Sequence, residues 1–394
     1  MLCPLNRCST DPAIIDGADT YTYQECHQLC CGIVQDLQKR GIRKGAVVAL
    51  RADTALPVIL TLFALWRLGA ICCPLSTRLP SIHAQLKQIS ATHFVIPKLN
   101  GKSQGTCELD LQNTATYLFT SGSTGRPKVA IHTLSNHLYS ALGINSYLKF
   151  GPTDTWKLSL PLWHVGGLAI LFRTFLAGGA VVLNGPATHA SWVPTQLGRA
   201  LDHPTNYKSI LIGGAPLPPE LALKAAHLPL IPTYGLTEMS STVLARSLPL
   251  PYRRVKLQNG ELFVAGEVLF KGYLGENPQN GWFATGDLAA PDFTILGRKD
   301  RLFISGGENI QPEEIETALL KIPGIQNACV VPVPDLEFGQ RPVAFIDNLH
   351  ASKELLSDLL PRFKHPIRYF VLPNYQGKPD LPALALKAKT LMQS

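Results

Sequence analysis

The chain has 394 residues, which suggests two or three domains and is ample for a large core. Charged residues make up 16% and apolar residues 46% of the sequence, which excludes a disordered or fibrous protein. The formal net charge is +8, but the basic residues are scattered. We therefore expect no nucleic-acid partner. The net positive charge is better explained by binding of a small polyanionic substrate.

Two apolar stretches, at 56–75 and 160–183, are interrupted by charged or polar residues. We expect them to be buried core elements and expect no membrane span. The N-terminus lacks the long apolar run of a signal peptide. The nine cysteines are odd in number and irregularly spaced, which argues against zinc and against a disulfide framework. We expect most of them to be small buried hydrophobes in a cytoplasmic protein.

Strand-like and helical segments alternate along the first 234 residues. In chain order we expect strand 46–51, helix 56–68, strand 116–120, helix 134–142, strand 157–160, helix 168–176, strand 180–183, helix 192–201, strand 209–212, helix 219–226 and strand 231–234. This alternation predicts βαβ units and largely parallel sheets. Ligands of such sheets bind beyond the carboxyl ends of the strands.

From about residue 255 short strands alternate with Gly-rich turns. Segments 261–264, 268–270 and 294–296 predict a small β-rich subdomain, and 297–301 is a charged connector. Beyond it, strand 302–304, helix 312–320 and strands 328–333 and 343–346 predict a compact α+β unit. The expected fold class is α/β, with a large N-terminal domain of layered sheets at 1–297, a connector at 298–301 and a small α+β C-terminal domain at 302–394.

One loop carries the most informative chemistry. It follows a strand and reads Thr120-Ser121-Gly122-Ser123-Thr124-Gly125-Arg126-Pro127-Lys128. Glycines let backbone N–H groups approach an anion, hydroxyls add donors, and Lys128 adds a positive charge. The spacing differs from a Walker A loop. A flexible polar surface loop is the alternative, but such loops seldom collect all these groups behind an apolar strand.

This loop resembles the phosphate loop of the adenylate-forming superfamily, which includes acyl-CoA synthetases and luciferases. Four more segments resemble the superfamily in the same order. They are 234–238 (YGLTE), 281–287 (GWFATGD), 297–300 (GRKD) and 305–310 (SGGENI). Within the superfamily, segments 161–167, 188–196 and 212–217 are most similar to the 2-succinylbenzoate–CoA ligases of menaquinone biosynthesis. Another aryl- or acyl-CoA ligase, or a non-catalytic nucleotide-binding relative, stays open as an alternative.

The resemblance implies an ATP-dependent acid–thiol ligase that uses Mg²⁺, a small carboxylic acid and coenzyme A. Residues 120–128 would surround the β- and γ-phosphates, Thr237 would contact the α-phosphate, and Glu238 would hold Mg²⁺. Tyr234 would stack on adenine, opposite a wall formed by Gly213, Gly214 and Ala215. A lone Glu after a turn is ordinarily a solvated side chain, and only the surrounding motif reverses that preference.

Further roles follow from the same resemblance. Asp287 would accept hydrogen bonds from the ribose hydroxyls, helped by Arg298, because an ionised carboxylate only accepts. His164 would lie beside the acyl pocket. Asp300 matches the hinge about which the family rotates its small, mobile C-terminal domain. His189, Ser191 and Thr195 are candidates for reading a second carboxylate of the acid.

The last matching segments concern the thiol and the catalytic lysine. Gly306 and Gly307 would admit the narrow pantetheine arm, and Glu308 would approach His164 in the thiolation state. The family carries a catalytic Lys near its end. We assign Lys378, although the following Pro379 departs from the family pattern, and keep Lys387 as the alternative. No carrier segment precedes the end at Ser394, so we expect free coenzyme A as the acceptor, and the oligomeric state stays open, with a homodimer as one candidate.

Overall fold

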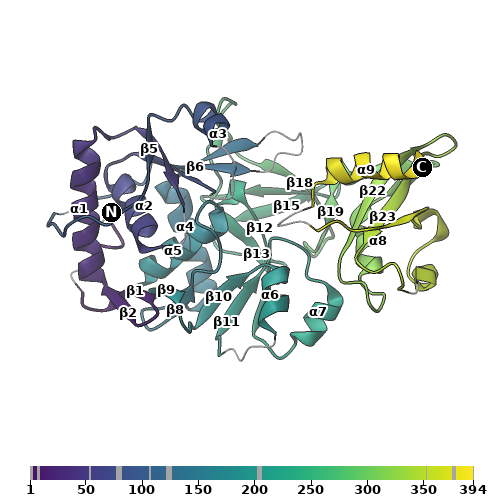
Figure 1. Cartoon of the computed structure of the whole chain (residues 1–394), viewed down its shortest axis with the longest axis horizontal. Helices are drawn as coiled ribbons and strands as arrows, with labels where there is room; N and C mark the ends of the chain where they lie inside the picture. Colours follow the sequence, from purple (N-terminus) through teal and green to yellow (C-terminus); the bar gives the residue numbers. More distant parts are fainter. Residues whose placement is uncertain are drawn as a thin grey trace. The chain divides into compact units, whose positions relative to one another are not determined.

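The computed structural model describes residues 3–6, 9–52, 55–76, 82–105, 108–120, 127–201, 206–351, 353–374 and 379–393 (Figure 1). The chain divides into two compact units. The larger unit comprises Met1–Ala215, Leu228–Val255 and Val264–Phe283, and the smaller comprises Pro216–His227, Lys256–Phe263 and Ala284–Ser394. The hinge that the sequence predicts at 298–301 stays a prediction.

A mixed sheet in the larger unit carries the start of the phosphate-loop segment. Its strands lie in the order β17-β7-β6-β4-β3-β5. Their bounds are β3 Val47–Arg51, β4 Ile71–Leu75, β5 His93–Val95, β6 Thr114–Thr120, β7 Lys128–Thr133 and β17 Gly272–Tyr273. Strands β3, β4, β5 and β6 pair in parallel, whereas β7 pairs antiparallel with both β6 and β17. The segment 121–126 therefore joins two antiparallel neighbours.

A second sheet, of nine strands, runs in the order β14-β13-β12-β11-β10-β8-β9-β1-β2 among the described residues. The bounds are β1 Pro12–Asp16, β2 Asp19–Thr22, β8 Thr155–Lys157, β9 Ala180–Asn184, β10 His189–Trp192, β11 Ser209–Ile212, β12 Leu230–Leu236, β13 Ser241–Ala245 and β14 Leu248–Pro249. The six central strands from β12 to β1 are parallel. The expected largely parallel sheet is confirmed, with antiparallel strands at its edges.

Apolar helices pack against both sheets. The helices of this layer are α1 Tyr23–Lys39, α2 Leu56–Arg67, α4 Leu134–Leu148 and α5 Val165–Ala177. Helix α4 contacts β6 and β7 of one sheet and β13 of the other, α2 contacts β4, and α5 contacts β8, β9 and β13. Three short helices complete the N-terminal part: α3 His83–Gln88, α6 Pro194–Ala200 and α7 Pro219–Lys224. None of the helices in the described ranges is long and apolar enough to cross a membrane.

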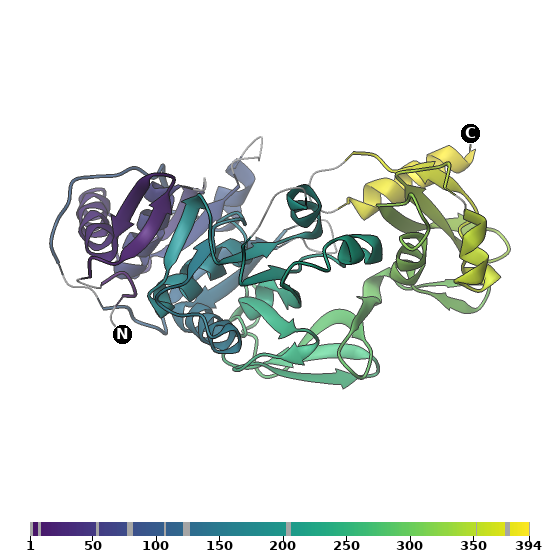
Figure 2. The same ribbon diagram turned by 90° about the horizontal axis from the view of Figure 1, so that it is seen from below.

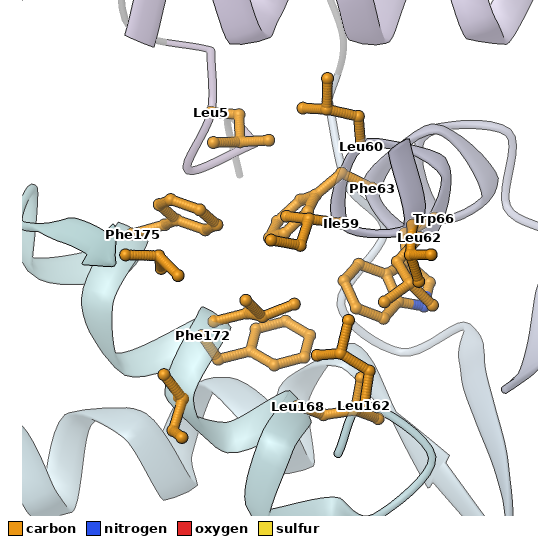
Figure 3. Packing of buried hydrophobic residues seen from close by; sticks show 14 of the residues in the cluster. Leu5, Ile59, Leu60, Leu62, Phe63, Trp66, Leu162, Leu168, Phe172 and Phe175 are labelled. Atoms are coloured by element: carbon orange, nitrogen blue, oxygen red, sulfur yellow. The ribbon is translucent and has the colours of Figure 1, made fainter. Parts of the chain in front are cut away.

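The centre of this layer is an aromatic cluster, formed by Phe63, Trp66, Phe172 and Phe175 and shown in Figure 3. Phe172 of α5 lies 4.8 Å from Trp66 of α2 between ring centroids, and Phe63 lies 5.4 Å from Phe175. All four side chains are at most 2% exposed. The two apolar stretches of the sequence are thus core elements, as expected. The seven described cysteines are all buried, in agreement with the prediction that most are small buried residues.

The remaining strands form three small sheets (Figure 2). One has the order β15-β16-β18-β19, another pairs β20 with β21, and the third has the order β22-β23-β24. Their bounds are β15 Arg254–Gln258, β16 Glu261–Ala265, β18 Phe283–Ala289, β19 Ile295–Arg298, β20 Phe303–Ser305, β21 Glu308–Ile310, β22 Ala328–Asp335, β23 Gly339–Ile346 and β24 Tyr369–Val371. Helices α8 Pro312–Leu319 and α9 Leu381–Gln393 contact β22, and short 3-10 turns lie at Lys353–Asp358 and Arg362–Lys364.

Three expected elements differ from the structure. The strand predicted at 157–160 shares only Lys157 with the observed strand β8, and residues 158–160 lie outside any strand. The helix predicted at 192–201 begins only at Pro194, and Trp192 instead ends the buried strand β10. The strand predicted at 268–270 is a loop, and the N–H of Phe270 donates to the carbonyl of Glu238 at 2.8 Å. The apolar run there packs its side chains without entering a sheet. The α/β class with a small α+β C-terminal region is confirmed.

Candidate functional site

The two ends of the phosphate loop lie side by side in the larger unit. Thr120, the last residue of β6, is the register partner of Lys128, the first residue of β7. Lys128 Nζ lies 2.9 Å from Glu276 Oε1 and 4.5 Å from the ring centroid of Tyr273. Both side chains of the ion pair are about half exposed, at 42% and 51%. Residues 121–126 lie outside the described ranges, so the proposed roles of Ser121, Gly122, Ser123, Thr124 and Gly125 stay predictions.

The turn that carries Thr237 and Glu238 is held at three points. It is a 3-10 turn, Thr237–Met239, directly after β12. The hydroxyl of Tyr273 donates to Glu238 Oε1 at 2.6 Å, and the Glu238 carbonyl accepts from Phe270 N–H at 2.8 Å. His132 Nε2 lies 2.7 Å from the carbonyl oxygen of Thr237. A half-buried carboxylate is thereby fixed beside the strand that begins with Lys128.

His132 belongs to a buried pair of imidazoles behind that turn. Its ring centroid lies 5.1 Å from that of His137, which stacks on Phe172 at 4.8 Å. His137 Nε2 lies 2.8 Å from Thr116 Oγ1. Burial lowers the pKa of His132 to about 4 and lowers the pKa of His137 well below its usual range, because a charged ring would lose its hydration. Both rings are therefore neutral at physiological pH.

We expect acid to destabilise the larger unit through these two rings. In the unfolded chain they take up protons below about pH 6.5, whereas folded His132 does so only near pH 4, so stability falls as the pH decreases through this window. Protonation of His132 alone lowers the free energy of unfolding by at most about 3 kcal/mol. Melting temperatures measured by tryptophan fluorescence between pH 7.5 and pH 4.5 test this. His137→Phe should flatten the decline, and the exposed His83→Gln should not; equal slopes in both variants would contradict the assignment.

The predicted adenine wall lies at the carboxyl end of β11. Gly213 follows Ile212, the last residue of β11, and the next strand along the sheet, β12, contains Tyr234. A Cβ on Gly213 would lie 2.5 Å from Thr233 Oγ1 and 2.8 Å from its carbonyl oxygen, so only glycine fits against β12. Gly214 and Ala215 are exposed. The structure thus brings Gly213 next to the residue that precedes Tyr234.

His164 caps the start of α5 without a side-chain hydrogen bond to the helix, and it is exposed. Its ring centroid lies 6.0 Å from that of Trp163. The chain turns tightly here, since a Cβ on Gly167 would lie 2.1 Å from the Pro161 carbonyl oxygen. Of the candidates for reading a second carboxylate, His189 is buried and stacks on Trp156 at 5.3 Å. Ser191 is buried as well, and its hydroxyl has no hydrogen-bond partner among the described residues.

In the smaller unit, three predicted residues meet, two on neighbouring strands and one in the 3-10 turn that follows them. Asp287 of β18 is the register partner of Arg298 of β19, and Arg298 Nη1 lies 3.2 Å from Asp287 Oδ1. The same guanidinium donates to both carboxylate oxygens of Asp300, at 3.1 Å and 3.0 Å. This hydrogen bonding lowers the pKa of the Asp300 carboxyl. The hinge candidate is therefore paired with the ribose-binding candidates.

Gly306 and Gly307 form the turn of the β20–β21 hairpin, with φ angles of +56° and +87°. Glu308 follows them and is exposed. Lys378 lies outside the described residues. The alternative, Lys387, is exposed on α9.

Sequence reasoning missed Tyr273, Glu276 and His132. Tyr273 and Glu276 lie about 35 residues beyond the Glu238 motif, in a segment for which the sequence predicts no strand or helix. His132 follows the phosphate loop in an apolar strand, where a histidine is ordinarily structural. The only available signal was chemical: each is a polar or aromatic residue in an otherwise apolar or turn-rich segment.

The sequence matches the family described as AMP-binding enzyme over residues 5–108 and 96–274, and the AMP-binding enzyme C-terminal domain over residues 314–374. It is 36% identical to 2-succinylbenzoate–CoA ligase from Salmonella typhimurium over 85% of each chain, and 36% identical to that from Escherichia coli with the same coverage.

Solved structures agree. A variant of E. coli MenE with bound OSB-AMS superposes with a TM-score of 0.87 at 32% identity and covers 97% of this chain and 96% of that one. The o-succinylbenzoate CoA synthetase from Bacillus subtilis, in complex with ATP and magnesium ion, gives a TM-score of 0.86 at 25% identity, with 96% and 98% covered. The chain belongs to the AMP-binding, adenylate-forming enzyme family.

Proposed function

We propose that the chain is an ATP-dependent ligase that activates 2-succinylbenzoate as an acyl-adenylate and transfers the acyl group to coenzyme A. The relatives that bear this name align over 85% of the chain. In the structure, the observation that carries the proposal is the convergence of opposite charges near one tyrosine. Tyr273 contacts both the Lys128 ammonium and the Glu238 carboxylate, the two groups that would face phosphates and a cation.

In the first half-reaction, a substrate carboxylate oxygen attacks the α-phosphorus of ATP, and the bond to the pyrophosphate group breaks. Two anions must approach each other, so the protein has to supply positive charge. Lys128 at the start of β7 would neutralise the outer phosphates, exchanging its exposed partner Glu276 for them. Exposed ion pairs of this kind contribute only about 0.2–1 kcal/mol, so Glu276 is readily displaced.

Glu238 fits a magnesium ion by its chemistry. Mg²⁺ binds to one or two carboxylates together with substrate phosphates and waters, so one protein carboxylate is sufficient. Glu238 is half-buried and has one oxygen engaged by Tyr273. Within the described ranges, no group of three or more His, Cys, Asp or Glu residues could hold a metal without such phosphates. When bound, the ion would neutralise charge that develops on the phosphates.

In the second half-reaction the thiol of coenzyme A attacks the acyl carbon, AMP leaves, and the thiol proton is released. Asp287, positioned by its ion pair with Arg298, would accept hydrogen bonds from the ribose hydroxyls of the nucleotide. The glycine turn at Gly306 and Gly307 would leave space for the pantetheine arm. His164 and Glu308 are both exposed, and each stays a candidate for the thiolation step.

Acid-dependent ATP–pyrophosphate exchange tests the proposal. We expect exchange with 2-succinylbenzoate to exceed that with benzoate, 2-acetylbenzoate and unbranched aliphatic acids, and to be followed by thioester formation once coenzyme A is added. Exchange confined to another acid would redirect the substrate assignment to a different aryl- or acyl-CoA ligase. Absence of exchange with every acid, while ATP still binds, would favour a non-catalytic relative.

Two further parts of the proposal concern the setting of the enzyme. A cytoplasmic location is supported by its proposed substrates, ATP and coenzyme A. A homodimer stays a prediction, which light scattering of the purified protein would decide.

A further inference from the structure

Tyr273 occupies an unusual place at the edge of the phosphate-loop sheet. It lies in the two-residue strand β17, where it is the register partner of Ala130 in β7. Its hydroxyl reaches across to Glu238 Oε1 at 2.6 Å, a contact between residues 35 positions apart in the sequence. The ring therefore connects the strand that begins with Lys128 to the turn that carries Glu238.

We propose that Tyr273 is a positioning residue that orients the Glu238 carboxylate for the divalent cation that accompanies ATP, an inference that rests on the proposed function. A carboxylate has two oxygens and can rotate about its last bond. A donor fixed on Oε1 stops this rotation and leaves Oε2 for the cation. Groups that hydrogen-bond to a metal ligand typically change metal affinity by about 10–100-fold when they are removed.

The ring of Tyr273 is itself held in place, which this role requires. Its edge packs against Phe270 with centroids 4.9 Å apart and an interplanar angle of 76°. The Lys128 ammonium lies 4.5 Å from the ring centroid. Phe270 also donates its backbone N–H to the Glu238 carbonyl, so the support of the tyrosine and the backbone of the carboxylate share one residue. The packing of the ring thus fixes the direction in which the Tyr273 hydroxyl points.

The hydroxyl and the ring have separable tasks. The ring packs against Phe270 and faces Lys128, whereas only the hydroxyl contacts Glu238. Replacing the tyrosine by phenylalanine removes the hydrogen bond and keeps the aromatic contacts. The expected defect is therefore in cation binding, while metal-independent binding of AMP stays intact.

The test measures Mn²⁺ binding by electron paramagnetic resonance, in the presence of an ATP analogue with a methylene bridge between its α- and β-phosphates. We expect Tyr273→Phe to weaken Mn²⁺ binding about 10–100-fold while the dissociation constant for AMP without metal is unchanged. Tyr252→Phe is the matched control, since its ring packs on Tyr139 at 5.0 Å, and it should behave as wild type. In a Glu238→Gln background, Tyr273→Phe should have little further effect.

The outcomes separate the inference from the proposed function. If wild type binds Mn²⁺ with the analogue and Tyr273→Phe binds it equally well, the positioning role is wrong although the function stands. If Tyr273→Phe weakens AMP and Mn²⁺ to the same extent, the tyrosine supports the fold and the inference fails. If wild type does not bind the metal–nucleotide pair at all, the proposed function itself fails.

Discussion

Lys378→Ala is expected to slow acyl-adenylate formation by about 10²–10³-fold, while thiolysis of a supplied acyl-adenylate continues. A positioned donor at a site of developing negative charge is typically worth about 2.7–4 kcal/mol, and an ammonium beside the carboxylate and α-phosphate would act in this way. In the second half-reaction AMP leaves and an uncharged thioester group forms. The Lys378 ammonium is therefore expected to contribute less to the rate of this step. Rapid-quench measurement of each half-reaction, with synthetic acyl-adenylate for the second, gives both rates.

The chain offers a matched control for this experiment. Lys387 is exposed on α9, nine positions further along, and Lys387→Ala should leave both rates close to wild type. Lys378 directly precedes Pro379 and Asp380, and Asp380 Oδ1 accepts from the N–H of Ala383 at the start of α9. Equal loss in both half-reactions would exclude Lys378 as the adenylation lysine. Loss in Lys387→Ala alone would move the role to that residue.

Local patterns were enough to locate most elements around the site. The strand expected at 209–212 is β11 with the same bounds, because four residues of mainly apolar character lie between Lys208 and a pair of glycines. The helix expected at 134–142 continues to Leu148. The sequence suggested an end before Gly143, but this glycine is needed for packing, since a Cβ there would lie 2.2 Å from Arg253 Nη1. A contact between segments 110 residues apart is not visible in local sequence.

The same limit applies to the site. Motifs placed Lys128, Glu238 and Asp287 on strands and turns, because glycines, hydroxyls and charges are grouped there in the sequence. Tyr273 could not be found this way, since its role depends on a pairing between β17 and β7 that spans some 140 residues. In the sequence, His132 looks like an ordinary strand residue. Only the structure shows that its ring contacts the Thr237 carbonyl. The roles of Tyr273 and His132 thus depend on contacts with residues distant in the sequence, which composition does not reveal.

Phe172→Ala is expected to lower the stability of the larger unit by about 3–5 kcal/mol, the usual cost of truncating a buried aromatic side chain. Phe172 is fully buried on α5. It lies 4.8 Å from Trp66 and 6.1 Å from Phe63 of α2 (Figure 3). It also stacks on His137 of α4 at 4.8 Å. Since three helices meet at this ring, the cavity left by alanine cannot be filled by moving one of them. The melting temperature should fall by roughly 6–20 °C.

Tryptophan fluorescence reports this transition selectively, because Trp66, Trp156, Trp163, Trp192 and Trp282 all belong to the larger unit. Phe94→Ala removes the same atoms from a side chain that is 43% exposed on β5, and should cost about 1 kcal/mol or less. If the two variants melted at the same temperature, the helices would have to close over the cavity, and the core between the two sheets would be more deformable than its aromatic packing implies. A large difference instead means that the layer holding α5, whose first turn follows His164, is rigid, so the candidate site is built on a fixed support.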